Sequence, residues 1–275
     1  MADVLRLTLL VDTRTRVLGL RTEPGFSLLV EVRGRRLLLD TGATGAFLDN
    51  GKALGVLPPS PDQVVLSHGH WDHTGGLPEA LASWPEAAVL HHPAFSTPRW
   101  SLYKDHPPRA LGLSSRARKA LVRHTGPVKA VETALDLGSG LGLLGPAPLR
   151  HPEEARSGPF FLDAEGTQPD PFLDELTLWI DTPAGLVVVL GCCHAGVLNT
   201  LEHALEATGA SRIRAVVGGL HLSKAGKERL AFTAEGLRRL GAPALHLCHC
   251  TGQEACEVLP NVVQALVAGD ETELA

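Results

Sequence analysis

The sequence has 275 residues, of which 44% are hydrophobic and 20% are charged, and its formal net charge is −5. This composition supports a sizeable folded core, excludes global disorder, and argues against a general nucleic-acid or membrane binder. No apolar run approaches the roughly 20 residues of a membrane span, and the first residues do not resemble a signal peptide. Five cysteines, an odd number, favour a reducing compartment, so we expect a cytoplasmic protein.

The first third of the chain predicts strands separated by short loops. Apolar runs bounded by charges, Gly or Pro indicate strands, and a tight turn between two of them needs residues that tolerate a positive φ. The expected strands cover 4–12, two segments of 25–44 joined at Arg33-Gly34, 64–66 and 86–93, with a short helix after Pro78.

Residues 94–160 have a different character, with frequent Pro and Gly and broken strand patterns. We interpret them as an insertion or lid within a single domain that covers 1–275. The part from 99 to 129 holds eight Lys and Arg residues and one acid, Asp105. Two interpretations stay open: a solvated helix face, or a clamp for an anionic substrate such as a phosphate ester. The candidate phosphate-binding residues are Arg116, Arg118 and Lys119.

Strands and helices alternate in the last hundred residues, which points to sheets covered by helices. The expected strands are 175–181, 185–191, 212–219 and 242–249, and the expected helices are 197–208, 227–240 and a Pro-interrupted 254–267. The final residues, AGDETELA, are expected to be frayed. Several strands end in short loops that contain His194, His221 or His249, and loops at the carboxyl ends of strands collect at one edge of a sheet.

The segment SHGHWDH, residues 67–73, is the strongest chemical signal. His68 and His70 are two positions apart, so in an extended loop both rings reach one ion, and Asp72 and His73 point to a second position. Burying three imidazoles and a carboxylate without an ion would be costly. We therefore expect a dinuclear site with two divalent metal ions, zinc foremost, with manganese or iron as alternatives.

HGHWDH resembles the H-x-H-x-D-H signature of the metallo-β-lactamase superfamily, and LLLDTGAT, residues 37–44, resembles the first motif of that family. The resemblance covers most of the chain. It implies an α/β fold, a four-layer αββα sandwich with the metals at one edge, here with an inserted basic lid region. It also implies that Asp40 orients the histidine loop from behind the metal ligands.

The later motifs depart from the common family pattern. Where most members carry a bridging aspartate after a strand and a glycine, this sequence has Gly191-Cys192-Cys193-His194. His194 is our candidate for that corner, with Cys192 as a second possibility. Glu175, in the slot of a third histidine, is a possible ligand or only a hydrogen-bond acceptor, and His221 occupies the position of the last histidine.

The motifs DELTL, GCCHAGVLNT, GGLHL and HCTG together resemble the 7,8-dihydropterin-6-methyl-4-(ribofuranosyl)aminobenzene-5′-phosphate synthase-like subfamily. This resemblance implies a metal-dependent hydrolase or a pyrophosphate-releasing transferase that acts on a phosphorylated or diphosphorylated small molecule. The expected partner is thus an anionic small molecule, and neither nucleic acid nor membrane. The alternatives are a phosphodiesterase or nuclease, against which the acidic remainder of the chain argues, and a redox di-iron protein on the same fold.

Two residues are candidates for proton transfer. Asp72, as a metal ligand, could also orient the nucleophile or accept its proton, and His249 could donate a proton to the leaving group. The other interpretation of His249 is a buried histidine that is hydrogen-bonded to the backbone.

Overall fold

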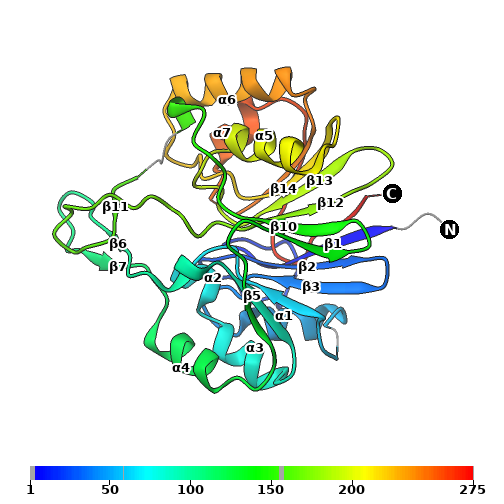
Figure 1. Cartoon of the computed structure of the whole chain (residues 1–275), viewed down its shortest axis with the longest axis vertical. Coiled ribbons are helices and arrows are strands. Elements are labelled where there is room, and N and C mark those ends of the chain that lie inside the picture. The colour runs from blue at the N-terminus through cyan, green and yellow to red at the C-terminus, as the bar shows by residue number, and fades with distance from the viewer. Residues whose placement is uncertain (1–3, 58, 155–157, 275) are drawn as a thin grey trace. The chain divides into compact units, whose positions relative to one another are not determined.

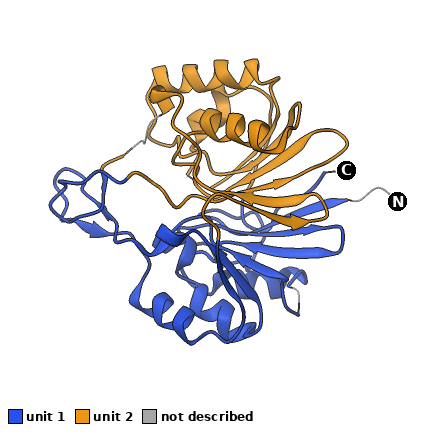
Figure 2. Ribbon diagram, viewed as in Figure 1, with its two compact units in different colours: residues 1–130, 160–170, 267–275 blue, residues 131–159, 171–266 orange. Residues whose placement is uncertain are grey.

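The structure, a computed structural model, describes residues 4–57, 59–154 and 158–274. The chain divides into two compact units (Figure 2), of which unit 1 comprises residues 1–130, 160–170 and 267–275, and unit 2 comprises 131–159 and 171–266. Each unit is built on one seven-stranded sheet. Within the described ranges, no helix has the length and apolar character needed to cross a membrane.

The sheet of unit 1 has the strand order β17-β1-β2-β3-β4-β5-β8. Its first half is antiparallel, whereas β3, β4, β5 and β8 run parallel, so the ends of β3 and β4 lie at the same edge. The strands are β1 (Leu5–Val11), β2 (Ser27–Val32), β3 (Arg35–Leu39), β4 (Gln63–Val65), β5 (Ala88–His91), β8 (Val128–Ala130) and β17 (Glu271–Leu274).

Three helices of unit 1 bury apolar side chains together with this sheet: α1 (Ala46–Leu54), α3 (Leu77–Ser83) and α4 (Ser115–Arg123). Phe47, Leu77 and Ala117, one from each helix, are fully buried in the same apolar cluster as Leu38 and Val64 of the sheet. The parallel strands and their edge loops therefore rest on a packed core, which positions the segments at the ends of β3 and β4.

A small three-stranded sheet completes unit 1, in the order β11-β6-β7. Its strands are β11 (Phe160–Phe161), β6 (Trp100–Ser101) and β7 (Arg109–Ala110). Strand β11 lies at least 59 residues after β6 in the sequence, and the two strands pair through only two residues each, as in Trp100 opposite Phe161. Figure 1 shows this sheet at the left of the view, away from the strands of the large sheet.

The sheet of unit 2 has the strand order β16-β15-β14-β13-β12-β10-β9, with β13 to β16 parallel and the remainder antiparallel. Figure 1 shows α5, α6 and α7 together over one side of this sheet, where their apolar faces share a core with β13, β14 and β15. The elements are β9 (Ala134–Gly138), β10 (Leu141–Leu144), β12 (Thr177–Ile180), β13 (Leu186–Leu190), α5 (Val197–Thr208), β14 (Ile213–Gly218), α6 (Lys227–Arg239), β15 (Ala244–Leu247), α7 (Gln253–Val258) and β16 (Val262–Ala265).

Two sequence-based predictions about the C-terminal part are wrong. The segment 254–267 is not one helix: α7 ends at Val258, and after Pro260, which interrupts the helical pattern, β16 pairs with β15. AGDETELA is not frayed, because β17 forms the edge strand beside β1, where Arg6 donates to Glu273 at 2.8 Å.

Residues 94–160 do not form one separate element. They supply β8 to the sheet of unit 1, β9 and β10 to the sheet of unit 2, two strands of the small sheet, helix α4 and the 3-10 turn η2 (Pro152–Glu154). A lid that closes over a ligand stays a prediction.

Candidate metal centre

The histidine loop begins where β4 ends and runs into α2 (Trp71–Thr74). Gly69 lies between two histidines at a point of very close packing, because a Cβ there would lie 1.8 Å from the carbonyl oxygen of Phe95. His70 precedes the helix, and its carbonyl accepts from the N–H of His73 at 3.1 Å. The short helix therefore places Asp72 and His73 on a turn directly after the extended part of the loop, and two separate metal positions stay a prediction.

Asp40 anchors this loop from the end of β3. Its Oδ1 accepts from the N–H of Ser67 at 2.7 Å, and its Oδ2 accepts from the Ser67 hydroxyl at 2.6 Å. The same Oδ2 lies 2.6 Å from Nδ1 of His73, both side chains being fully buried. A carboxylate acceptor places the imidazole proton on Nδ1, so the lone pair of His73 is on Nε2, the atom that a metal would take.

The donor atoms of the loop lie close together. The ring centroid of His68 is 4.5 Å from that of His70 and 4.2 Å from that of His73, and Nε2 of His73 is 4.0 Å from Oδ2 of Asp72. Atoms of Asp40, His68 and His73 that could bind a metal all lie within 4.8 Å of one another. Imidazole nitrogens and a carboxylate oxygen are the donor set of Zn, Mn and Fe sites, so the histidines of the loop together with Asp72 fit the expected ions.

The residue directly before strand β6 of the small sheet, Arg99, is one that the sequence motifs did not single out. Arg99 is 2% exposed, its Nε donates to Asp170 Oδ2 at 2.7 Å, and its Nη1 would lie 2.9 Å from a Cβ at Gly69. Phe160, in strand β11 of the small sheet, has its ring centroid 5.9 Å from that of His70. The only hint in the sequence was the general excess of basic residues over 99–129.

The three predicted phosphate-binding residues lie on the exposed side of α4. Arg116 donates to Glu79 at 2.5 Å, and Arg118 donates to the carbonyl oxygen of Ser96 at 3.0 Å. Lys119 is also exposed. These contacts fit the solvated helix face, and a role in binding phosphate stays a prediction.

In unit 2, the GCCHAG loop connects β13 to α5 and carries His194. The His194 ring is stacked on Phe172, with centroids 4.1 Å apart and an interplanar angle of 9°, and its centroid is 4.4 Å from that of His221. Both oxygens of the Glu175 carboxylate accept main-chain hydrogen bonds, from His194 and, at 2.8 Å, from Ala195. This geometry favours the interpretation of Glu175 as an acceptor that orients the loop.

The two adjacent cysteines of this loop have different surroundings. Cys192 has its sulfur within 4.8 Å of a ring nitrogen of His194 and of one of His249. Cys193 instead contacts the Thr200 hydroxyl at 3.4 Å, and burial raises the pKa of its thiol well above 9.0. The Cys193 sulfur lies against Thr200, whereas the Cys192 sulfur lies close to ring nitrogens of candidate histidines, so Cys192 is the better candidate of the two.

Four of the candidate segments hold a non-glycine residue in the left-handed region. Asp40 has φ of 60°, Cys193 58°, His221 50° and His249 48°. Each follows the carboxyl end of a strand, namely β3, β13, β14 or β15. Such conformations persist only where the surrounding structure enforces them, and they are enriched at functional sites.

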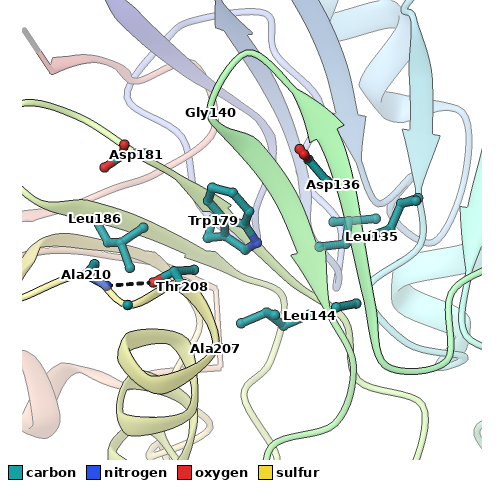
Figure 3. A pocket seen from close by; sticks show the side chains of 13 residues that line it. Leu135, Asp136, Gly140, Leu144, Trp179, Asp181, Leu186, Ala207, Thr208 and Ala210 are labelled. Carbon is teal, nitrogen blue, oxygen red and sulfur yellow. Dashed lines mark hydrogen bonds between the residues drawn. The ribbon is translucent and has the colours of Figure 1, made fainter.

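A separate cavity of about 560 Å³ lies in unit 2 (Figure 3). Trp179 and two carboxylates, Asp136 and Asp181, face it beside the C-terminal turn of α5. None of the candidate metal ligands lines this cavity, so it is distinct from the metal-ligand loop of the same unit.

Comparison with known proteins agrees with the motifs. The sequence pattern of the metallo-beta-lactamase superfamily matches residues 20–198. The 7,8-dihydropterin-6-methyl-4-(beta-D-ribofuranosyl)-aminobenzene-5'-phosphate synthase of Methanocaldococcus jannaschii is 30% identical over 85% of this chain and 83% of its own. A solved metal-dependent hydrolase of the beta-lactamase superfamily is 32% identical, with a TM-score of 0.82 over 98% of this chain and 99% of that chain.

More distant structures share the fold alone. A diphosphatase of the PhnP family is 14% identical, with a TM-score of 0.55 over 100% of this chain and 98% of that chain. Together, these likenesses show the α/β metallo-β-lactamase fold that the histidine motif predicts.

Proposed function

The chain belongs to the metallo-β-lactamase superfamily, and from that premise we propose that it is a metal-dependent hydrolase or transferase acting on a phosphorylated or diphosphorylated small molecule. The observation that carries the proposal is the histidine loop, in which His68, His70, Asp72 and His73 come together and Asp40 fixes the ring of His73. The 30% identical synthase, whose name contains a 5'-phosphate, supports the substrate class.

We propose two divalent ions, with zinc as the first candidate. His68 and His70 would bind one ion, and Asp72 and His73 the other. Further ligands would come from His194, in the slot where most family members have an aspartate, with Cys192 as the alternative for that corner, and from His221. Imidazole, carboxylate and thiolate donors all suit zinc, which supports this assignment.

When bound, such ions would lower the pKa of a water molecule towards about 7 and neutralise charge on phosphate oxygens. The residues of the chain would supply the remaining chemistry. Asp72 would hold the nucleophile in line or accept its proton, and His249 would donate a proton to the leaving group. Asp40 and Glu175 would keep the ligand loops in position through their hydrogen bonds.

The direct test measures phosphate and pyrophosphate release from a panel of phosphate esters and pterin diphosphates by the metal-loaded protein. His68→Ala is expected to lose bound metal and activity together, whereas His106→Ala, which changes an exposed histidine, should lose neither. Activity that survives in His68→Ala would contradict the site. Tightly bound iron with visible absorbance and no phosphate release would favour the redox alternative, and cleavage of nucleic acid alone would favour the nuclease.

A further inference from the structure

Residues 150–154, here called the strap, run along one side of α5. Three residues of α5 at the i, i+3 and i+7 positions bind the strap, so the contact follows one face of the helix. Asn199 Oδ1 accepts from the N–H groups of Arg150 and His151 at 2.7 and 2.9 Å, Glu202 pairs with His151 at 2.9 Å, and Glu206 pairs with the Arg150 guanidinium.

The strap ends in a carboxylate that is completely buried, Glu154. Its Oε2 accepts from the N–H of Leu198 at 2.6 Å and from that of Asn199 at 3.3 Å. Its Oε1 accepts from the Thr233 hydroxyl of α6 at 3.1 Å and lies 3.6 Å from Nη2 of Arg229. Burial is the largest influence and raises the pKa of Glu154, while these donors and the guanidinium act in the opposite direction and offset part of that shift.

Glu154 supplies what the start of α5 lacks. The residue before the helix, Gly196, has no side chain with which to cap the first turn, and no side-chain cap is formed there. The orphan N–H groups and the positive end of the helix dipole favour an anion at this point, and Glu154 provides it from 44 positions earlier in the chain.

The same carboxylate explains a glycine of the GCCHAG motif. Gly196 has φ of 94°, and a Cβ there would lie 2.5 Å from Cβ of Glu154. The strap therefore packs directly against the main chain two residues after His194. A side chain at this position would push the strap and the loop apart.

Two buried carboxylates thus hold the loop from both ends. Glu175 binds the N–H groups of His194 and Ala195, and Glu154 binds those of Leu198 and Asn199. We infer that Glu154 is a positioning residue, which fixes the first turn of α5 and, through it, the backbone that aims the His194 ring. This inference rests on the proposed function, in which His194 is a metal ligand.

The test compares Glu154→Ala, Glu154→Gln and the wild type by residue-resolved amide exchange and by metal affinity in chelator competition. In Glu154→Ala, the amides of His194 and Ala195, which Glu154 does not touch, should exchange at least about tenfold faster. Metal affinity should fall about 10- to 100-fold, as for other groups that orient ligands. Glu154→Gln keeps the shape and one acceptor, so it should recover part of both losses.

The control is Glu206→Gln, which removes the ion pair at the other end of the strap and should change neither measurement. If Glu154→Ala only lowers the melting temperature, with exchange at His194 and metal affinity unchanged, Glu154 is structural and the inference is wrong. Thr233→Val removes one donor to Glu154 and should give smaller shifts in the same direction, should the alanine variant not fold. A wild type that binds no metal would overturn the proposed function, and the exchange rates alone would then decide on Glu154.

Discussion

At the scale of single residues, Gly69 is the position of the histidine loop with the least space. A methyl group there would lie 1.8 Å from the Phe95 carbonyl oxygen, a main-chain atom that cannot move aside alone. Gly69→Ala should therefore destabilise the fold by about 1–3 kcal/mol, as for other overpacked sites, and should reduce bound metal. Denaturant unfolding and metal analysis measure the two effects.

The matched control for this change is Gly226→Ala on the surface of unit 2. A Cβ at Gly226 meets no atom within 4 Å, and its φ of −73° suits any residue. We expect this variant to lose no more than about 1 kcal/mol of stability, because Gly226 is the N-cap of α6 and alanine caps a helix less well than glycine, and to keep all of the bound metal. Equal effects at Gly69 and Gly226 would show that the close packing at the histidine loop is unimportant.

Asp40 is the second residue that the geometry makes testable. Asp40→Asn keeps the size of the side chain but replaces one of two accepting oxygens with a donor, so the contacts with Ser67 and His73 cannot all be kept. Metal affinity should fall about 10- to 100-fold, as when other groups that orient metal ligands are changed. Chelator competition measures this loss, and Asp49→Asn, at an exposed pair with Arg21, is the control.

The residues of the site differ in how visible they are in the sequence. The histidine loop is evident because its donors are neighbours in the chain and their spacing alone brings them together. Glu154 and Arg99 could not be found in this way. Glu154 accepts from an N–H group 44 positions away and Arg99 donates to a carboxylate 71 positions away, and no local sequence pattern predicts either pair. Glu175 was visible as an acid in the right slot, but only its two main-chain hydrogen bonds favour the orienting role.

At the scale of elements, α4 carries the predicted phosphate-binding face. If the face contributes to binding, replacing Arg116, Arg118 and Lys119 with Gln should raise KM for anionic substrates at least about threefold, because exposed charge contacts contribute about 0.2–1 kcal/mol each. The turnover number should stay constant, since the contacts do not change in the transition state. The effect should shrink in high salt, which screens exposed charges.

The control for α4 is the double variant Arg238→Gln and Arg239→Gln in the last turn of α6. It removes two exposed positive charges from another helix and should leave KM unchanged. If the α4 variant also leaves KM unchanged, the role of Arg116 is limited to its ion pair with Glu79. The three side chains then form a solvated helix face that does not bind the substrate.

The elements that the sequence predicts well are those with a local cause. The turn between β2 and β3 forms at Arg33 and Gly34, with φ of 50° and 74°, and α5 covers the predicted 197–208. Strands β16 and β17 were missed because each lies at the edge of a sheet and forms only through a distant partner. β17 pairs with β1 from the opposite end of the chain, a contact that hydropathy does not reveal.

At the scale of the whole molecule, one buried and two half-buried histidines connect stability to pH. Burial lowers the pKa of His91, His203 and His246 below the ordinary value of 6.5. Of these, His246 lies within β15 and is 5% exposed. Glu154 acts with the opposite sign, because burial raises its pKa and stability is gained as the pH falls towards 4.5. Comparing the unfolding free energies of His246 and Glu154 variants with that of the wild type at each pH separates the histidine contribution from the Glu154 contribution.

We predict that the metal-free protein loses stability as the pH falls below about 6.5. Each of these histidines has a lower pKa in the folded state than in the unfolded state, so the unfolded chain binds more protons in this range. Their stabilising contribution is full above 6.5 and is lost as the pH falls through the folded values. His246→Leu should flatten this part of the profile in denaturant unfolding, whereas His106→Leu, at an exposed position, should not. Parallel profiles for His246→Leu and the wild type would show that His246 takes up its proton without unfolding.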